Sequence, residues 1–179
     1  MEILMGERVC LRSLTDTDTQ ALFSYYSDPE AMRYWAWPAY TEVAQAQKLL
    51  TEAQEGSPEA GYLAWGIAQR TGNALLGTCS LYRIDLNNGR AEIGYLLGRP
   101  HWGQGLASEA VVLAIDYAFT TLGLRRLEAD IDPRNVGSHK LLERLGFERD
   151  GYLRERWCVA GEISDSALYG LLAREWKRK

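Results

Sequence analysis

The chain has few of the residues that mark metal sites and disulfide-bonded scaffolds. Its two histidines, His101 and His139, are too few and too far apart in sequence to indicate a zinc site. Its three cysteines, Cys10, Cys79 and Cys158, are widely spaced in apolar, strand-like segments, which is typical of reduced core cysteines in the cytosol. We therefore expect no metal and no disulfide framework.

Long apolar runs and an excess of positive charge are also missing. No segment approaches the roughly 20 consecutive apolar residues of a membrane span. Residues 1–7 hold two acidic residues and no basic run before an apolar stretch, so a secretory signal is not indicated. The net charge of −4 argues against a protein that coats nucleic acid and is compatible with a cationic acceptor. These absences predict a cytoplasmic protein that binds neither membrane nor nucleic acid.

The sequence does have enough apolar content for one compact domain. It has 179 residues, of which 46% are hydrophobic, and no repeat, low-complexity tract or linker interrupts it, so we expect a single domain over 1–179. The apolar spacing and turn residues predict helices and strands in an order that is not a βαβ array, which favours an α/β domain with a largely antiparallel sheet. The expected strands are 8–14, 62–68, 74–84, 91–97, 126–131 and two flanking a turn at 160–162, and the expected helices are 19–26, 40–56, 106–122 and 135–145.

The segment 99–110 is the most informative. Gly103 and Gly105 follow a buried strand and precede a long apolar helix. Strand, glycine turn and helix place free backbone N–H groups and a positive helix end at one point, which suits a phosphate or pyrophosphate. Glycine lets the backbone approach the anion without a Cβ in the way. A simple turn into the helix explains the glycine pair equally well.

Two common phosphate-binding loops are disfavoured here. The NTPase loop needs Gly-Lys-Ser/Thr, but Leu106 and Ala107 follow Gly105. The dinucleotide fingerprint needs a third glycine where this chain has Ser108. A loop that holds phosphates through its backbone amides alone remains.

This loop and a second segment resemble the Gcn5-related N-acetyltransferase (GNAT) superfamily. Its loop reads Gln/Arg-x-x-Gly-x-Gly/Ala, and the chain has both glycines but Pro100 in place of the Gln or Arg. Residues 132–147 resemble the second motif, Asn-x-x-Ser…Leu-Gly-Phe. A Trp-Gly-x-Gly loop after a proline, together with segments 6–12 and 33–38, is similar to the bacterial ribosomal-protein N-terminal acetyltransferases. The likeness runs from about residue 6 to about residue 175.

The resemblance implies a fold and an activity. The fold would be a single GNAT domain whose mostly antiparallel sheet of about seven strands is flanked by helices and splayed between its fourth and fifth strands. The activity would be transfer of an acetyl group from acetyl-CoA to a primary amine. The amine would belong to a protein N-terminus or to a small molecule. The enzyme would be a monomer or a homodimer. A non-catalytic CoA-binding sensor or partner domain of the same fold remains the alternative.

The chemistry needs a base for the ammonium proton and a donor for the departing thiolate. Glu92 matches the catalytic glutamate of those members whose strand begins Ala-Glu-Ile. It is alternatively a structural carboxylate paired with Arg90 or Arg83, and ordered water or Glu155 is then the base. Ser138 matches the subgroup's serine, which donates to the thiolate or caps its helix. Much of the superfamily has a tyrosine for this role where the chain has Leu142.

The resemblance also assigns binding residues. Asn135 would clamp a pantetheine amide, cap its helix, or do both. The thioester carbonyl would be polarised by a main-chain N–H at 95–97, where the family's strand bulges, and His139 and Lys140 are candidates for the adenine or its 3′-phosphate. The expected cofactor-binding set is Tyr95, Leu96, Leu97, Trp102, Gly103, Gln104, Gly105, Leu106, Ala107, Asn135 and Ser138. The expected acceptor wall is Trp35, Trp37, Tyr40 and Trp157, with packing against the sheet as the alternative.

Overall fold

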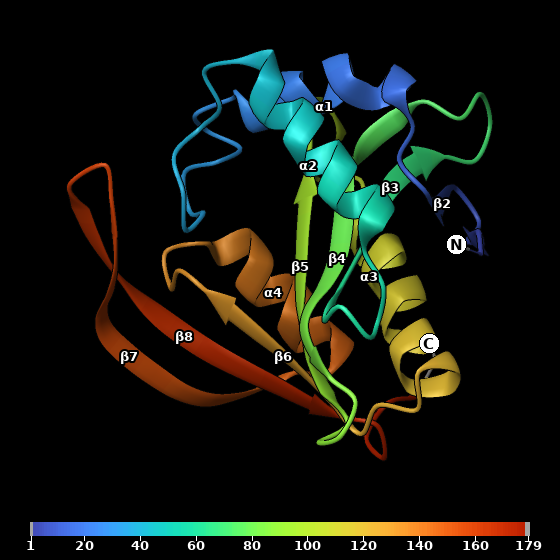
Figure 1. The fold of residues 1–179 in the computed structure, drawn as a ribbon. Helices are drawn as coiled ribbons and strands as arrows, with labels where there is room; N and C mark the ends of the chain where they lie inside the picture. The colour runs from blue at the N-terminus through green and yellow to red at the C-terminus, as the bar shows by residue number, and fades with distance from the viewer. Residues whose placement is uncertain (1, 178–179) are drawn as a thin grey trace.

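The computed structural model describes residues 2–177 and arranges them as one eight-stranded sheet with helices on both faces (Figure 1). The strands lie in the order β1-β2-β3-β4-β5-β6-β8-β7. Their bounds are β1 Leu4–Met5, β2 Val9–Arg12, β3 Tyr62–Gln69, β4 Leu75–Asp85, β5 Arg90–Leu97, β6 Arg126–Ile131, β7 Glu148–Val159 and β8 Glu162–Leu172. The helices are η1 Asp16–Asp18, α1 Thr19–Tyr26, α2 Val43–Glu55, η2 Arg99–His101, α3 Leu106–Asp116, the π-helical η3 Tyr117–Thr121 and α4 Val136–Leu145.

The expected α/β architecture is confirmed, with small differences. All neighbouring strands are antiparallel except β5 and β6. The additional strand, β1, has two residues, too few for an alternating pattern to show. The helix expected over 106–122 is α3 continued by η3. Cys158 is exposed on β7, so the expectation of three core cysteines holds for Cys10 and Cys79 but is wrong for this one.

Two apolar cores lie on opposite faces of the sheet. One core joins α1 and α2 to strand residues that include Ala64 and Leu96. The other joins α3 and α4 to strand residues that include Trp65 and Leu97. Because successive side chains of a strand point to opposite faces, the position of a residue along β5 decides which pair of helices it faces. Even-numbered residues of 92–97 therefore face α1 and α2, and odd-numbered ones face α3 and α4.

The sheet opens between β5 and β6. The two strands pair only through residues 90–92 and 126–128. Beyond these residues β5 continues to Leu97 and β6 to Ile131 with no pairing between them, and Figure 1 shows the two strands diverging with α4 beside the gap. The splay expected between the fourth and fifth strands is confirmed, since these are β5 and β6 when the two-residue β1 is not counted.

No helix in the described part of the chain is long and apolar enough to cross a membrane.

Candidate active site

A cavity of about 1340 Å³ lies where β5 and β6 separate. Both strands line it, together with segment 33–40, parts of α2, the start of α4 and the β7–β8 hairpin. The expected site residues that line it are Trp35, Trp37, Tyr40, Glu92, Tyr95, Asn135, Ser138 and Trp157. The structure thus brings the expected base, thiolate donor and acceptor wall to one cavity, with the phosphate loop outside its lining.

Glu92 lies on the face of the sheet that is covered by α1 and α2. It is 8% exposed and pairs in register with Tyr82 of β4. The Nη1 atom of Arg83 lies 2.7 Å from its Oε1 atom. Tyr82 and Arg83 both line the cavity, although consecutive residues of a regular strand point to opposite faces. The register shift between Tyr82 and Asp85, where Arg83 has φ +50°, explains this arrangement.

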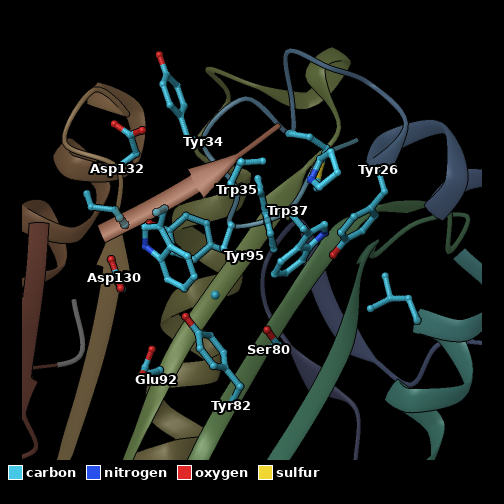
Figure 2. Close-up of a pocket in the computed structure, with 18 of the residues that line it drawn as sticks. Tyr26, Tyr34, Trp35, Trp37, Ser80, Tyr82, Glu92, Tyr95, Asp130 and Asp132 are labelled. Atoms are coloured by element: carbon cyan, nitrogen blue, oxygen red, sulfur yellow. The ribbon is translucent and has the colours of Figure 1, made fainter. Parts of the chain in front are cut away.

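A second carboxylate, that of Asp130 on β6, lines the same cavity. Figure 2 shows Glu92 and Asp130 on one side of the cavity and Tyr26 and Trp37 on the other. The Nε atom of Arg156 lies 3.5 Å from Oδ2 of Asp130. Burial, then the negative charges of Glu92 and Asp130, raise the pKa of Tyr82, so its phenol stays protonated at neutral pH. The pocket therefore contains a neutral phenol and two carboxylates, each of which is paired with an arginine.

Tyr95, Ser138 and Asn135 meet on the opposite face of the sheet. The Tyr95 hydroxyl and the Ser138 Oγ lie 2.6 Å apart. The Oδ1 atom of Asn135 accepts a hydrogen bond of 3.1 Å from the Ser138 backbone N–H and so caps α4. Because Asn135 supplies the cap, the hydroxyl of Ser138 does not have that role. Leu142, at the position where much of the superfamily has a tyrosine, is a fully buried hydrocarbon and supplies no hydroxyl.

The phosphate loop leads from β5 into α3. Gly103 and Gly105 have φ values of +73° and +76°, in the left-handed region that favours glycine, and Gly105 is the N-cap of α3. The indole N–H of Trp102 donates to the carbonyl oxygen of Leu97 at 2.6 Å, which ties the loop to the end of β5. The loop therefore presents the N-terminal amides of α3 beside the open end of the sheet.

Two residues that the sequence analysis missed support this loop. Arg8, just before β2, donates from Nη1 to the carbonyl oxygen of Gln104 at 2.8 Å and from Nε to Glu109 Oε2 at 2.9 Å. Burial acts to raise the pKa of the Glu109 carboxyl, but hydrogen bonds from the N–H groups of Arg8 and Val9 and from the guanidinium outweigh it and lower that pKa. Arg8 and Glu109 are 101 positions apart, so no local pattern connects them.

The strand bulge expected at 95–97 is wrong. Residues 92–97 of β5 pair one to one with residues 82–77 of β4, and the shift lies on β4 between Tyr82 and Asp85. Backbone groups of a strand alternate in direction, so alternate amides of β5 beyond Glu92 point toward the side from which β6 has diverged. The splay, rather than a bulge, makes these backbone groups available.

The acceptor wall is an aromatic cluster that continues into the core. Tyr40 stacks on the buried Tyr26 with ring centroids 5.1 Å apart, and Trp35 meets Tyr26 edge to face at 5.8 Å. Trp35 also meets Trp37, which is 40% exposed, at 4.8 Å. Trp35 and Tyr40 therefore pack against the core and line the cavity at once. From the β7–β8 hairpin, the Trp157 indole N–H donates to Ser166 Oγ at 3.0 Å.

Three other candidates lie away from the cavity lining. Glu155 is exposed in a bulge of β7 with φ +52°, where its backbone N–H donates to Asp165, so the structure does not support it as a base. His139 contacts the hydroxyl of Tyr169 through Nδ1, and Lys140 is exposed on α4. Within residues 2–177, no group of three or more His, Cys, Asp or Glu residues has the arrangement of a metal site.

An open sheet with a glycine loop at the end of β5 and a cavity in its gap is the arrangement expected of a GNAT domain. Comparison with known families matches residues 8–148 to the acetyltransferase (GNAT) domain. The chain belongs to this family, and it is an acetyltransferase.

Individual relatives agree with this assignment. The chain is 42% identical over 176 residues to the uncharacterized N-acetyltransferase p20 of Bacillus licheniformis, covering 98% of this chain and 99% of the relative. It is 26% identical to the [ribosomal protein uS5]-alanine N-acetyltransferase of Escherichia coli, covering 97% of this chain and 92% of that protein. Its fold matches the crystal structure of a GNAT-family acetyltransferase from Bacillus anthracis with a TM-score of 0.86 and 24% identity, covering 97% and 100% of the two chains.

Proposed function

We propose that this acetyltransferase moves acetyl from acetyl-CoA to a primary amine by direct attack of the amine on the thioester. The observation that carries the proposal is that one cavity in the β5–β6 gap is lined by Glu92 from one face of the sheet and by Ser138 from the other. Amine and thioester can therefore approach from opposite faces and meet in the gap.

The donor side is formed by backbone amides and one side-chain amide. The N-terminal amides of α3 and the loop at Gly103 and Gly105 receive the pyrophosphate. The Oδ1 atom of Asn135 is occupied by the helix cap, which leaves its Nδ2 group to donate to a carbonyl of the pantetheine arm. Amides of β5 beyond Glu92 donate to the thioester oxygen as it becomes negative.

The acceptor side binds and deprotonates the amine. Glu92 takes the ammonium proton, directly or through a water, and the aromatic wall holds the body of the acceptor. The amine nitrogen then forms a bond to the acetyl carbon and releases its second proton to solvent as the amide forms, and the carbon–sulfur bond breaks with its electron pair on sulfur. The hydroxyl of Ser138 donates a hydrogen bond to this sulfur. The acceptor is a peptide N-terminus or a small amine, and the alanine N-acetyltransferase relative makes peptides that begin with alanine the first to try.

The test is turnover of acetyl-CoA carrying labelled acetyl with peptides and small primary amines. Thiol release is followed continuously, and mass spectrometry identifies the product. We expect one labelled acetyl group on the amine for each CoA released, and none on the same peptide with its amino group blocked. Binding of acetyl-CoA without thiol release, for every amine, would contradict the proposal and support a non-catalytic CoA-binding domain.

A further inference from the structure

The side chains of Tyr95 and Ser138 form a pair across two elements. Their hydroxyl oxygens lie 2.6 Å apart, and both residues line the cavity. Tyr95 comes from β5 and Ser138 from α4, 43 positions later in the chain. The sequence motif draws attention to Ser138 and to the backbone at Tyr95, but it gives no role to the phenol.

The phenol of Tyr95 is held in place by the fold. Tyr95 is an odd-numbered residue of β5, so it faces α3 and α4, where its ring packs against their core. Ser138 lies on the first turn of α4, and its backbone N–H is fixed by Asn135. The two hydroxyl groups therefore meet because a strand and a helix N-terminus are both rigid at this point.

The chemistry of the pair sets the direction of its hydrogen bond. Either hydroxyl can donate in this contact, and because a phenol is ordinarily a stronger acid than an alkyl hydroxyl, we assign Tyr95 as the donor and Ser138 as the acceptor. The hydrogen of Ser138 is then free to point into the cavity, and donation by Tyr95 polarises it further. Burial raises the pKa of Tyr95 above its ordinary value of 10.0, whereas an alkyl thiol such as cysteine has a pKa of about 8.5, so the phenol keeps its proton when the thiolate leaves.

We infer that Tyr95 is a positioning residue that orients the Ser138 hydroxyl toward the thioester sulfur, an inference that rests on the proposed function. As the carbon–sulfur bond breaks, sulfur takes the bonding electron pair and accepts the hydrogen bond of Ser138. The thiolate leaves and takes its proton from solvent, and neither hydroxyl changes its protonation state. In this chain, a phenol on β5 acting through Ser138 compensates for the hydrocarbon at position 142.

A second contact between α4 and a tyrosine of the sheet serves as a matched control. The hydroxyl of Tyr169 on β8 contacts His139 Nδ1, one residue after Ser138, and neither Tyr169 nor His139 lines the cavity. If the Tyr95–Ser138 bond only holds α4 against the sheet, Tyr95→Phe and Tyr169→Phe have the same effects. Both would lower stability, and kcat would change to the same extent in the two variants.

The experiment measures kcat, both KM values and urea unfolding for wild type, Tyr95→Phe, Tyr169→Phe, Ser138→Ala and the Tyr95→Phe/Ser138→Ala double variant. We expect Tyr95→Phe to lower kcat about tenfold, the effect of one lost hydrogen bond, with the KM for acetyl-CoA within about twofold of wild type. Tyr169→Phe keeps the wild-type kcat. The double variant is no slower than Ser138→Ala alone, because Tyr95 acts through Ser138.

The outcomes separate the two proposals. The role of Tyr95 would be overturned, without affecting the proposal of acetyl transfer, by either of two results. One is a wild-type kcat in Tyr95→Phe. The other is a decrease of kcat in the double variant that equals the product of the decreases in the two single variants. Equal kcat losses in Tyr95→Phe and Tyr169→Phe would show that the bond only anchors α4. A wild-type protein that releases no CoA with any amine would overturn the proposed function itself.

Discussion

Substitution of Asn135 separates the helix cap that the structure shows from the cofactor contact that we propose for the same side chain. Its Oδ1 atom caps α4 by accepting from the Ser138 N–H at 3.1 Å, and its Nδ2 group is proposed to hold the pantetheine arm. Serine caps a helix about as well as asparagine, but its side chain has no amide N–H. Alanine has neither group. Asn135→Ser and Asn135→Ala therefore form a matched pair.

The expected magnitudes follow from these contacts. Loss of the cap in Asn135→Ala lowers the free energy of unfolding by about 1 kcal/mol, whereas Asn135→Ser changes it by a few tenths. Both variants lose one hydrogen bond to acetyl-CoA, worth about 1 kcal/mol net, which raises the KM for acetyl-CoA about fivefold. The KM for the amine should change less in both.

Urea unfolding and initial rates with each substrate varied in turn measure the two effects. The assignment of Nδ2 is refuted if Asn135→Ser keeps the wild-type KM for acetyl-CoA, or if only the KM for the amine rises. The assignment of the cap is refuted if Asn135→Ser and Asn135→Ala are equally destabilised.

Two further predictions concern the phosphate loop. Gly105→Val should weaken acetyl-CoA binding at least tenfold, about 1.4 kcal/mol, because its φ of +76° strains a branched residue and the new Cβ would obstruct the approach of the backbone to the pyrophosphate. Calorimetry measures the affinity for acetyl-CoA. The control is Gly123→Val, because Gly123 also has a positive φ (+64°) and an added Cβ would meet nothing within 4 Å. Equal affinity in the two variants would contradict the assignment of the phosphate loop. Glu109→Gln should lower the free energy of unfolding at pH 7 by about 1 kcal/mol, a modest figure since its partner Arg8 is 54% exposed. The pKa of Glu109 in the folded protein lies below its ordinary 4.5. The loss of unfolding free energy in Glu109→Gln, relative to wild type, is therefore full above pH 4.5 and shrinks as the pH falls through the folded pKa. Denaturation curves between pH 7 and 3 that show the same loss at every pH would contradict this.

Local patterns in the sequence predicted the parts of this fold that depend on neighbouring residues. The glycine pair and the apolar run after it predicted the loop and α3, and alternation predicted most strands. The two-residue β1 and the π-helical geometry of the helix after α3 were not predicted, because these segments are too short to produce a period. The family resemblance supplied the splay, and the structure places it where β5 outruns its pairing with β6.

The site was predicted by residue type but not by geometry. Glu92 and Ser138 do line one cavity, and of the two arginines considered as partners of Glu92 it is Arg83 that pairs with it, beside a bulge on β4 that no local signal marks. Tyr95 was selected for its backbone, although alternation along β5 already places its side chain on the α4 face. Glu155 lies outside the cavity lining because a bulge in β7 leaves it exposed. Such contacts depend on segments far apart in the chain.

The most direct measurement of the central claim is the pH–rate profile of Glu92→Gln. This variant keeps the shape of the side chain and removes the base, and Arg83, whose side chain is 58% exposed, remains solvated without its partner. We predict that kcat falls by about 10²–10⁴ with acetyl-CoA affinity nearly unchanged, and that the acidic limb of the profile flattens. Proton removal relayed by water from Glu92 predicts a smaller loss that high pH partly restores. Near-wild-type kcat at pH 7 with an unaltered acidic limb would contradict the account and leave Glu92 a structural carboxylate.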